Sequence, residues 1–106
     1  MDAQELRQRI REVLVPGGEP VGESGRRPDV RLIVGQLGEA ESFFGRLREL
    51  GEVIEVTDYP GVLVRLGEEG NVGLRSASKS GEPTIDVGLE CVPEIRKIKF
   101  VYDTEW

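Results

Sequence analysis

The chain has no histidine and only one cysteine, Cys91. Without histidine the Ser-His and Cys-His pairs of nucleophilic catalysis are excluded, and a lone cysteine cannot form an internal disulfide. Structural zinc sites draw mostly on Cys and His, and no EF-hand loop pattern occurs, so we expect neither a metal nor a cofactor. Cys91 follows Glu90 and has no activating partner, which predicts a structural thiol. These absences exclude most familiar hydrolases.

Long hydrophobic runs are also missing, and no stretch approaches the roughly 20 apolar residues needed to cross a membrane. The N-terminus, residues 1–5, is polar and acidic and lacks the basic start and apolar core of a secretory signal. With 106 residues, of which 38% are hydrophobic and 32% charged, the chain fits one globular domain with one core.

The net charge of −6 disfavours general binding to nucleic acid, because that affinity depends on neutralising phosphates with Lys and Arg. The acid is concentrated in residues 1–70, which hold nine Arg against fourteen Asp or Glu. Residues 71–102 hold five basic and four acidic side chains, so the C-terminal part is nearly balanced.

Two segments have helical periodicity. Residues 3–14 place Leu6, Ile10, Val13 and Leu14 on one face, and residues 39–50 place Ala40, Phe43, Phe44, Leu47 and Leu50 on one face before Gly51. Between them, residues 16–28 are rich in Gly and Pro, which predicts a mobile connector or a partly ordered loop. We therefore divide the chain into an N-terminal helix with its connector, 1–28, and a compact unit, 29–106.

After residue 51 the period changes to that of β-strands. Short β-type runs occupy 53–56, 62–66, 72–76, 84–87 and 95–101, whereas 30–34 is either a strand or an extended lead-in. The connections are short, which favours antiparallel neighbours. The sequence thus predicts an α+β fold, with N-terminal helices packed on a four- to five-stranded antiparallel meander.

Strand alternation predicts which side chains share a face. The simplest packing turns Ile85, Val87, Ile98 and Phe100 toward the helix, and Arg96 shares the side of Ile98 and Phe100. The opposite, open face then carries Thr84, Asp86, Lys97 and Lys99, joined by Arg75 if Val72 and Leu74 point inward.

The segment richest in chemistry is Arg75-Ser76-Ala77-Ser78-Lys79-Ser80-Gly81-Glu82-Pro83-Thr84-Ile85-Asp86. Its cations and hydroxyls suit a phosphodiester, and Asp86 could accept a proton or orient a base. The same residue types also occur in ordinary turns and on solvated strand faces, and composition alone favours that simpler interpretation.

Residues 29–101, about two thirds of the chain, resemble the C-terminal toxin domains of bacterial polymorphic toxins of the contact-dependent and Rhs type. The resemblance lies in 30–35, 40–44, 59–64, 70–87 and 95–100, in that order and spacing. It implies a metal-independent ribonuclease of the barnase, EndoU, colicin and RelE group, in which helices precede an antiparallel sheet that holds the active face. Two features depart from the pattern: Glu82, where a small residue or proline is typical, and the acidic loop 89–94.

The resemblance implies that RNA is cleaved by transesterification, with tRNA or rRNA as the substrate. The catalytic residues would be Arg75, Asp86, Lys97 and Lys99, and the substrate-binding residues would be Ser78, Lys79, Ser80 and Thr84. In this mechanism Arg75 and Lys97 or Lys99 stabilise the pentacoordinate phosphate, and either Asp86 or a lysine moves the proton. It also implies a cognate immunity protein as partner, no membrane association, and action in the cytoplasm after export within a larger effector.

Two alternatives fit the acidic composition. One is a non-enzymatic protein-binding module, such as an immunity or interaction protein, for which the charge and an exposed sheet edge would serve docking. The other is an inactive member of the toxin fold.

Overall fold

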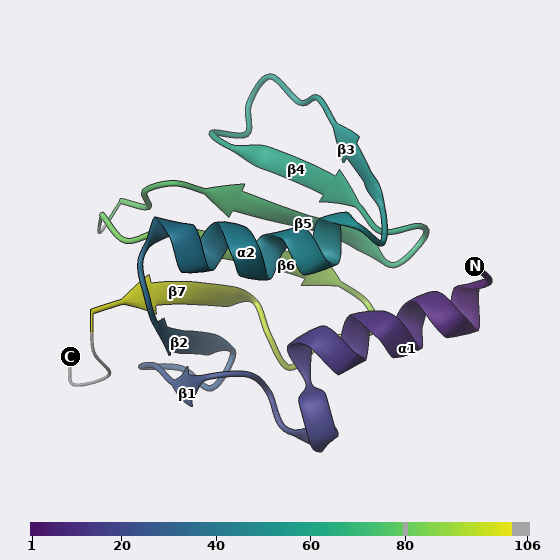
Figure 1. Ribbon diagram of the computed structural model, residues 1–106, viewed down its shortest axis with the longest axis horizontal. Coiled ribbons are helices and arrows are strands. Elements are labelled where there is room, and N and C mark those ends of the chain that lie inside the picture. Colours follow the sequence, from purple (N-terminus) through teal and green to yellow (C-terminus); the bar gives the residue numbers. More distant parts are fainter. Residues whose placement is uncertain (80, 103–106) are drawn as a thin grey trace.

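The computed structural model describes residues 1–79 and 81–102, which form two α-helices and a seven-stranded mixed sheet (Figure 1). The helices are α1 (Ala3–Leu14) and α2 (Leu37–Arg48), and a 3-10 turn, η1, spans Pro16–Gly18. The strands are β1 (Glu23–Ser24), β2 (Val30–Val34), β3 (Glu52–Ile54), β4 (Val62–Arg65), β5 (Gly70–Arg75), β6 (Thr84–Leu89) and β7 (Lys97–Val101). Neither described helix has the length and apolarity that a membrane span requires.

The strands lie in the order β1-β2-β7-β6-β5-β4-β3. From β3 to β7 each strand pairs antiparallel with the next, as the short connections predict. The prediction of a four- to five-stranded, wholly antiparallel sheet was wrong, because β2 pairs parallel with β7 and β1 extends the sheet beyond β2. A parallel pair needs a long crossover, and here the crossover contains α2 and the whole meander.

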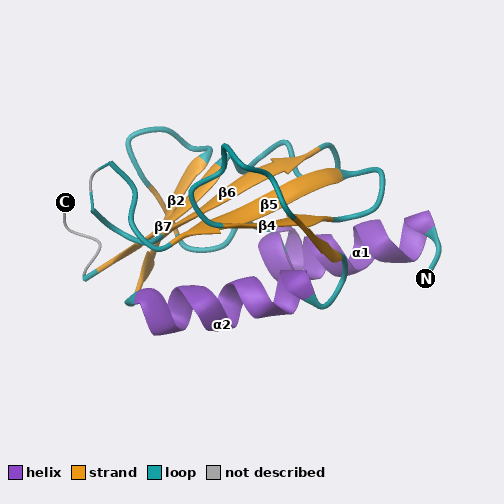
Figure 2. Cartoon of the chain, turned by 90° about the horizontal axis from the view of Figure 1, so that it is seen from above, coloured by secondary structure: helices purple, strands orange, loops and turns teal. Residues whose placement is uncertain are grey.

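The two helices cover one face of the sheet, and the loops rise above the other (Figure 2). Ile85, Ile98 and Phe100 are buried in the core with Phe44 and Leu47 of α2. The predicted inward face of β6 and β7 is therefore confirmed. Val72 is also fully buried and Leu74 packs against the same core, so alternation places Arg75 on the open face.

The first 28 residues pack against the rest of the chain. Ile10 and Leu14 of α1 are fully buried in the core that also holds α2 and β7. Within the connector, β1 pairs with β2, and the Nε of Arg31 donates to the carbonyl of Val21 at 2.8 Å. Of the two alternatives predicted for residues 16–28, the structure agrees with the partly ordered loop.

Helix α2 begins two residues before the predicted start. The side chains and amides of Gln36 and Glu39 form a reciprocal capping box, which satisfies backbone donors at the first turn. The helix ends at Arg48, and the amide of Gly51 donates to the carbonyl of that residue at 3.2 Å. Polar side chains thus set the start of the helix, and backbone hydrogen bonds close its end.

Two glycines on and after α2 give a matched test of this packing. An alanine methyl group at Gly45 meets no atom, so Gly45→Ala should stabilise the fold by about 0.5–1 kcal/mol through the lower chain entropy of alanine. At Gly51 the added Cβ would collide with the backbone carbonyl of Arg65, so Gly51→Ala should destabilise it by about 1–3 kcal/mol. Urea unfolding of both variants measures whether each change raises or lowers the free energy of unfolding. The same change in both variants would contradict the packing of β3 and β4 against the helix end.

Candidate functional site

The register of β5, β6 and β7 brings five of the eight predicted site residues onto the open face. Asp86 lies opposite Lys97 on one side and Gly73 on the other. In the next row, Thr84 lies opposite Lys99 and Arg75. Side chains in such directly opposed positions are about 5 Å apart at Cβ. The five residues on this face are Arg75, Thr84, Asp86, Lys97 and Lys99.

Arg75, Asp86 and Tyr59 form a hydrogen-bonded cluster on this face. The guanidinium of Arg75 donates to Asp86 through both Nε (2.7 Å, to Oδ2) and Nη2 (3.0 Å, to Oδ1). The hydroxyl of Tyr59 donates to Oδ2 of Asp86 at 2.8 Å. Tyr59 reaches this position because its ring lies over Gly73, where any Cβ would collide with the phenol.

The cluster fixes the charges of its members. The hydrogen bond with Asp86 raises the pKa of Arg75 above its already high value, so this side chain stays cationic. Burial, followed by the hydrogen bond to Asp86, raises the pKa of Tyr59 well above its ordinary value. Tyr59 is therefore a neutral donor at physiological pH, and both carboxylate oxygens of Asp86 are engaged as acceptors.

Glu82 binds Lys99 through its carboxylate and Thr84 through its backbone carbonyl. The Nζ of Lys99 donates to Glu82 at 2.9 Å. Burial raises the pKa of Glu82, but the hydrogen bond and charge of Lys99 together with hydrogen bonds from the backbone and Ser78 outweigh it, so the pKa lies below its ordinary range. Thr84 is fully buried, and its hydroxyl donates to the carbonyl of Glu82 at 3.2 Å. The predicted phosphate-binding hydroxyl of Thr84 is thus turned to the backbone and is not at the surface.

The remaining predicted substrate-binding residues lie in the connection between β5 and β6. Ser78 is half-buried, and its amide donates to the carbonyl of Glu82 at 2.9 Å, which closes the loop. Lys79 is exposed beside it. Ser80 lies outside the described residues.

A second set of cations lies next to β7. A cavity of about 450 Å³, the basic cavity, opens between the connection that follows β1 and the start of β7, and its cationic lining consists of Arg26, Arg27, Arg96, Lys97 and Lys99. The prediction that Arg96 turns toward the helix was wrong. The strand begins only at Lys97, and the amide of Arg96 donates to the carbonyl of Asp29 at 2.8 Å, so strand alternation does not extend to it.

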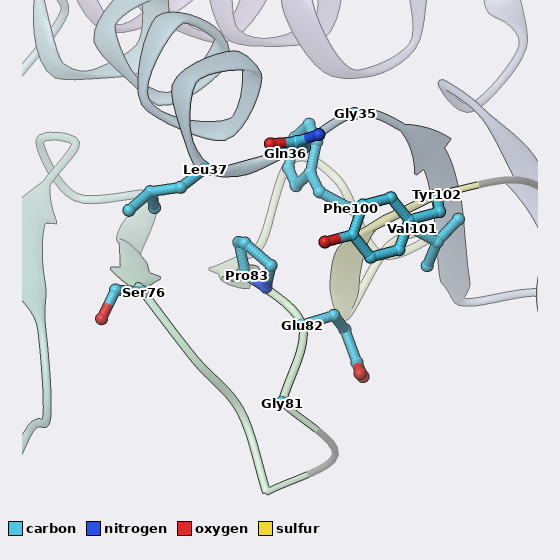
Figure 3. Close-up of a pocket in the computed structure, with 10 residues that line it drawn as sticks. All are labelled: Gly35, Gln36, Leu37, Ser76, Gly81, Glu82, Pro83, Phe100, Val101 and Tyr102. Atoms are coloured by element: carbon cyan, nitrogen blue, oxygen red, sulfur yellow. The ribbon is translucent and has the colours of Figure 1, made fainter.

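Another cavity, of about 600 Å³, lies at the other end of β7 (Figure 3). Leu37, Pro83 and Phe100 surround it, and Glu82 lies at its edge. None of its described lining residues is basic or belongs to the eight predicted site residues. Of these two cavities, only the basic cavity has a cationic lining among the described residues.

Comparison with known proteins finds no match for this chain. The chain matches no family model, no curated protein and no solved structure. A functional assignment therefore depends on the geometry of the open face. Among the described residues no group of three or more potential metal ligands comes together.

Sequence reasoning missed Tyr59 and the arginines of the basic cavity. Tyr59 belongs to a Tyr-Pro-Gly turn, and its partner Asp86 is 27 residues away in the chain. Gly73, an interior glycine in a strand, was the available signal, since such a glycine often marks a close approach by another group. Arg26 and Arg27 lie in the connector, where composition gave no position relative to β7.

Replacing Tyr59 with phenylalanine tests the cluster. Loss of its hydrogen bond to Asp86 should reduce the free energy of unfolding by about 1 kcal/mol near neutral pH. Because folding raises the pKa of Tyr59, its contribution is present below the ordinary tyrosine pKa and is lost as pH rises toward the folded value. Urea unfolding at pH 8 and above pH 10 should show the difference between wild type and Tyr59→Phe shrinking at the higher pH; a constant difference would refute the hydrogen bond.

The thiol of Cys91 gives a further test of the structure. Burial, and then the neighbouring carboxylate of Glu69, raise its pKa to about 11. At pH 8 its alkylation by iodoacetamide should be roughly a hundredfold slower than in the urea-unfolded chain, because the thiolate is the reacting form. Comparable rates in the two states would show that Cys91 is more accessible than its position beside Glu69 and α1 implies.

Proposed function

We propose that the chain binds RNA on the open face of its sheet and cleaves it without a metal, by attack of a ribose 2′-hydroxyl on the adjacent phosphate. The observation that carries this proposal is the position of Arg75. Asp86 and Tyr59 hold it on the face that also presents Lys97 and Lys99. A cation fixed in advance is what a pentacoordinate phosphate requires, since its extra negative charge develops only in the transition state.

In the proposed reaction the 2′-oxygen bonds to phosphorus and the bond from phosphorus to the 5′-oxygen breaks. The products are a 2′,3′-cyclic phosphate and a 5′-hydroxyl, and the proton lost by the 2′-oxygen is balanced by one delivered to the 5′-oxygen. Arg75 retains N–H groups beyond the two bonded to Asp86, and these would bind the phosphoryl oxygens. Lys97 would supply a second positive charge from the neighbouring strand.

The bonds of Asp86 favour one of the two roles considered for it. Both of its oxygens accept hydrogen bonds, from Arg75 and Tyr59, which supports a role in positioning Arg75. Lys97 suits the charge-stabilising role better than Lys99, because Lys99 donates to Glu82 whereas Lys97 forms no ion pair with a described residue.

The arrangement of the fold supports membership of the barnase, EndoU, colicin and RelE group. Both helices precede the antiparallel run β3 to β7 and cover one face, which leaves the other for a substrate (Figure 2). We propose on this basis a toxin domain that acts on cytoplasmic tRNA or rRNA and is neutralised by an immunity protein. Growth arrest with RNA cleavage upon expression, relieved by that partner, is the corresponding cellular test.

A protein-binding module is the second candidate, and the edge of the sheet favours it. Strand β3 is an edge strand, and Val53, Val56 and Val62 are exposed on or near it. Unpaired backbone groups beside apolar side chains are the features to which a partner strand adds. Purified protein that cleaves no RNA but binds a partner through β3 would favour this alternative.

Replacement of Arg75 tests the proposed reaction. Arg75→Ala should lower the rate of RNA cleavage by purified protein by about a hundred- to a thousandfold, the cost of losing one preset donor to the transition state. Arg75→Lys should recover little, because an ammonium group cannot reproduce the paired bonds to Asp86. Cleavage of a labelled RNA with analysis of the cyclic phosphate end measures both.

The matched control is Arg65→Ala, which removes an exposed arginine from neighbouring β4. It should leave the cleavage rate within about twofold, as expected for a surface charge outside the cluster. Circular dichroism of both variants should match the wild type. Wild-type protein without cleavage activity, or an Arg75→Ala variant with full activity, would overturn the proposed function.

A further inference from the structure

The basic cavity concentrates positive charge in a protein whose net charge is −6. Among the described residues that line it, five are cationic and none is acidic. Val30 and Leu32 complete the lining with apolar surface. Neither Arg26 nor Lys97 forms an ion pair with a described residue, so the positive charge of the cavity is only partly neutralised within the chain.

Asp29 explains how cations from distant parts of the sequence come together. Its backbone carbonyl accepts the amides of Arg96 and Lys97, at 2.8 and 3.2 Å, which fastens the connection before β2 to the start of β7. Its carboxylate lies 3.6 Å from the Nε of Arg27 and 3.5 Å from the Nε of Arg96. One carboxylate thus lies within ion-pair distance of two guanidinium groups, both of which stay largely exposed to solvent.

The cavity adjoins the proposed cleavage site. Lys97 lines it and lies opposite Asp86, the residue that holds Arg75. Neighbouring strands are about 5 Å apart, so an extended anion that reaches Arg75 on β5 would cross β6 and pass Lys97 on the way into the cavity. A single phosphate cannot occupy both places, whereas successive phosphates of one strand can.

We propose that the basic cavity is a second phosphate site, in which Arg26, Arg27 and Arg96 bind a backbone phosphate of the RNA strand next to the one that is cleaved. This inference rests on the proposed function and specifies its substrate as a single strand with phosphates on both sides of the cut. Arginine suits this role because its planar fork pairs with two phosphate oxygens. The apolar side chains of Val30 and Leu32 offer contact to the carbon atoms of a ribose or base.

The test uses the double variant Arg26→Gln/Arg96→Gln in the full chain. The control, Arg9→Gln/Arg48→Gln, removes the same charge from exposed positions on α1 and α2, which cover the other face. Binding is measured with a fluorescent single-stranded oligonucleotide of about ten nucleotides, a length within the range that such grooves cover. Its 2′-hydroxyls are replaced by hydrogen, so it cannot be cleaved.

The first variant should bind the oligonucleotide about tenfold more weakly at low salt, and the slope of log affinity against log salt should fall by about 0.7 for each phosphate that the variant no longer binds. In cleavage of RNA its KM should rise by a similar factor while kcat stays within about twofold. The control variant should bind and cleave like the wild type. An equal loss of affinity in both variants would show that the effect comes from net charge, and it would overturn the proposed site.

The outcomes separate this inference from the proposed function. Wild type that binds the oligonucleotide through Arg26 and Arg96 but cleaves no RNA would overturn the cleavage proposal and leave the phosphate site standing. Cleavage with an unchanged KM in the Arg26→Gln/Arg96→Gln variant would overturn the phosphate site and leave the reaction standing. Inorganic pyrophosphate or a polyglutamate peptide that competes as well as the oligonucleotide would show a small-anion or protein site instead of a nucleic acid strand.

Discussion

Alternation along β5, β6 and β7 is the constraint on which the rest of the structure depends. Successive side chains of a strand point to opposite faces, so burying Ile85 and Ile98 against the helices places Asp86 and Lys97 on the other face together. A slip of one residue in either strand would expose the core and bury the charges, and the hydrophobic pattern opposes such a slip. The same feature that stabilises the fold therefore assembles the candidate site.

The charges of the open face are organised by a few carboxylates, each of which has a definite partner. Asp86 holds Arg75, Glu82 holds Lys99, and Asp29 lies between two arginines of the basic cavity. A buried or half-buried carboxylate beside a guanidinium keeps the cation in one place, which lowers the cost of orienting it when an anion arrives. An acidic protein can in this way hold several cationic side chains on one face.

The site expected from the sequence and the cluster that the structure forms lie on the same face of the sheet, but their residues differ in part. Thr84 was expected to bind substrate, yet its hydroxyl donates to the backbone carbonyl of Glu82. Tyr59 and the arginines of the connector lie outside the predicted set, yet they contact or adjoin Arg75, Asp86 and Lys97. Residue type indicates where on a strand a site could lie, whereas burial decides which of those side chains can contact a ligand.

The sequence by itself determined the α+β class, the helical faces, the antiparallel run from β3 to β7 and the shared face of Arg75, Asp86, Lys97 and Lys99, because each of these follows from local periodicity. It did not determine the parallel pairing of β2 with β7, the position of Tyr59 over Gly73, or the approach of Arg26 and Arg27 to β7. Those contacts join segments far apart in the chain, and their formation depends on loop closure and on packing against the finished sheet. Only the tertiary structure could decide them, since no pattern within one segment records what lies across from it.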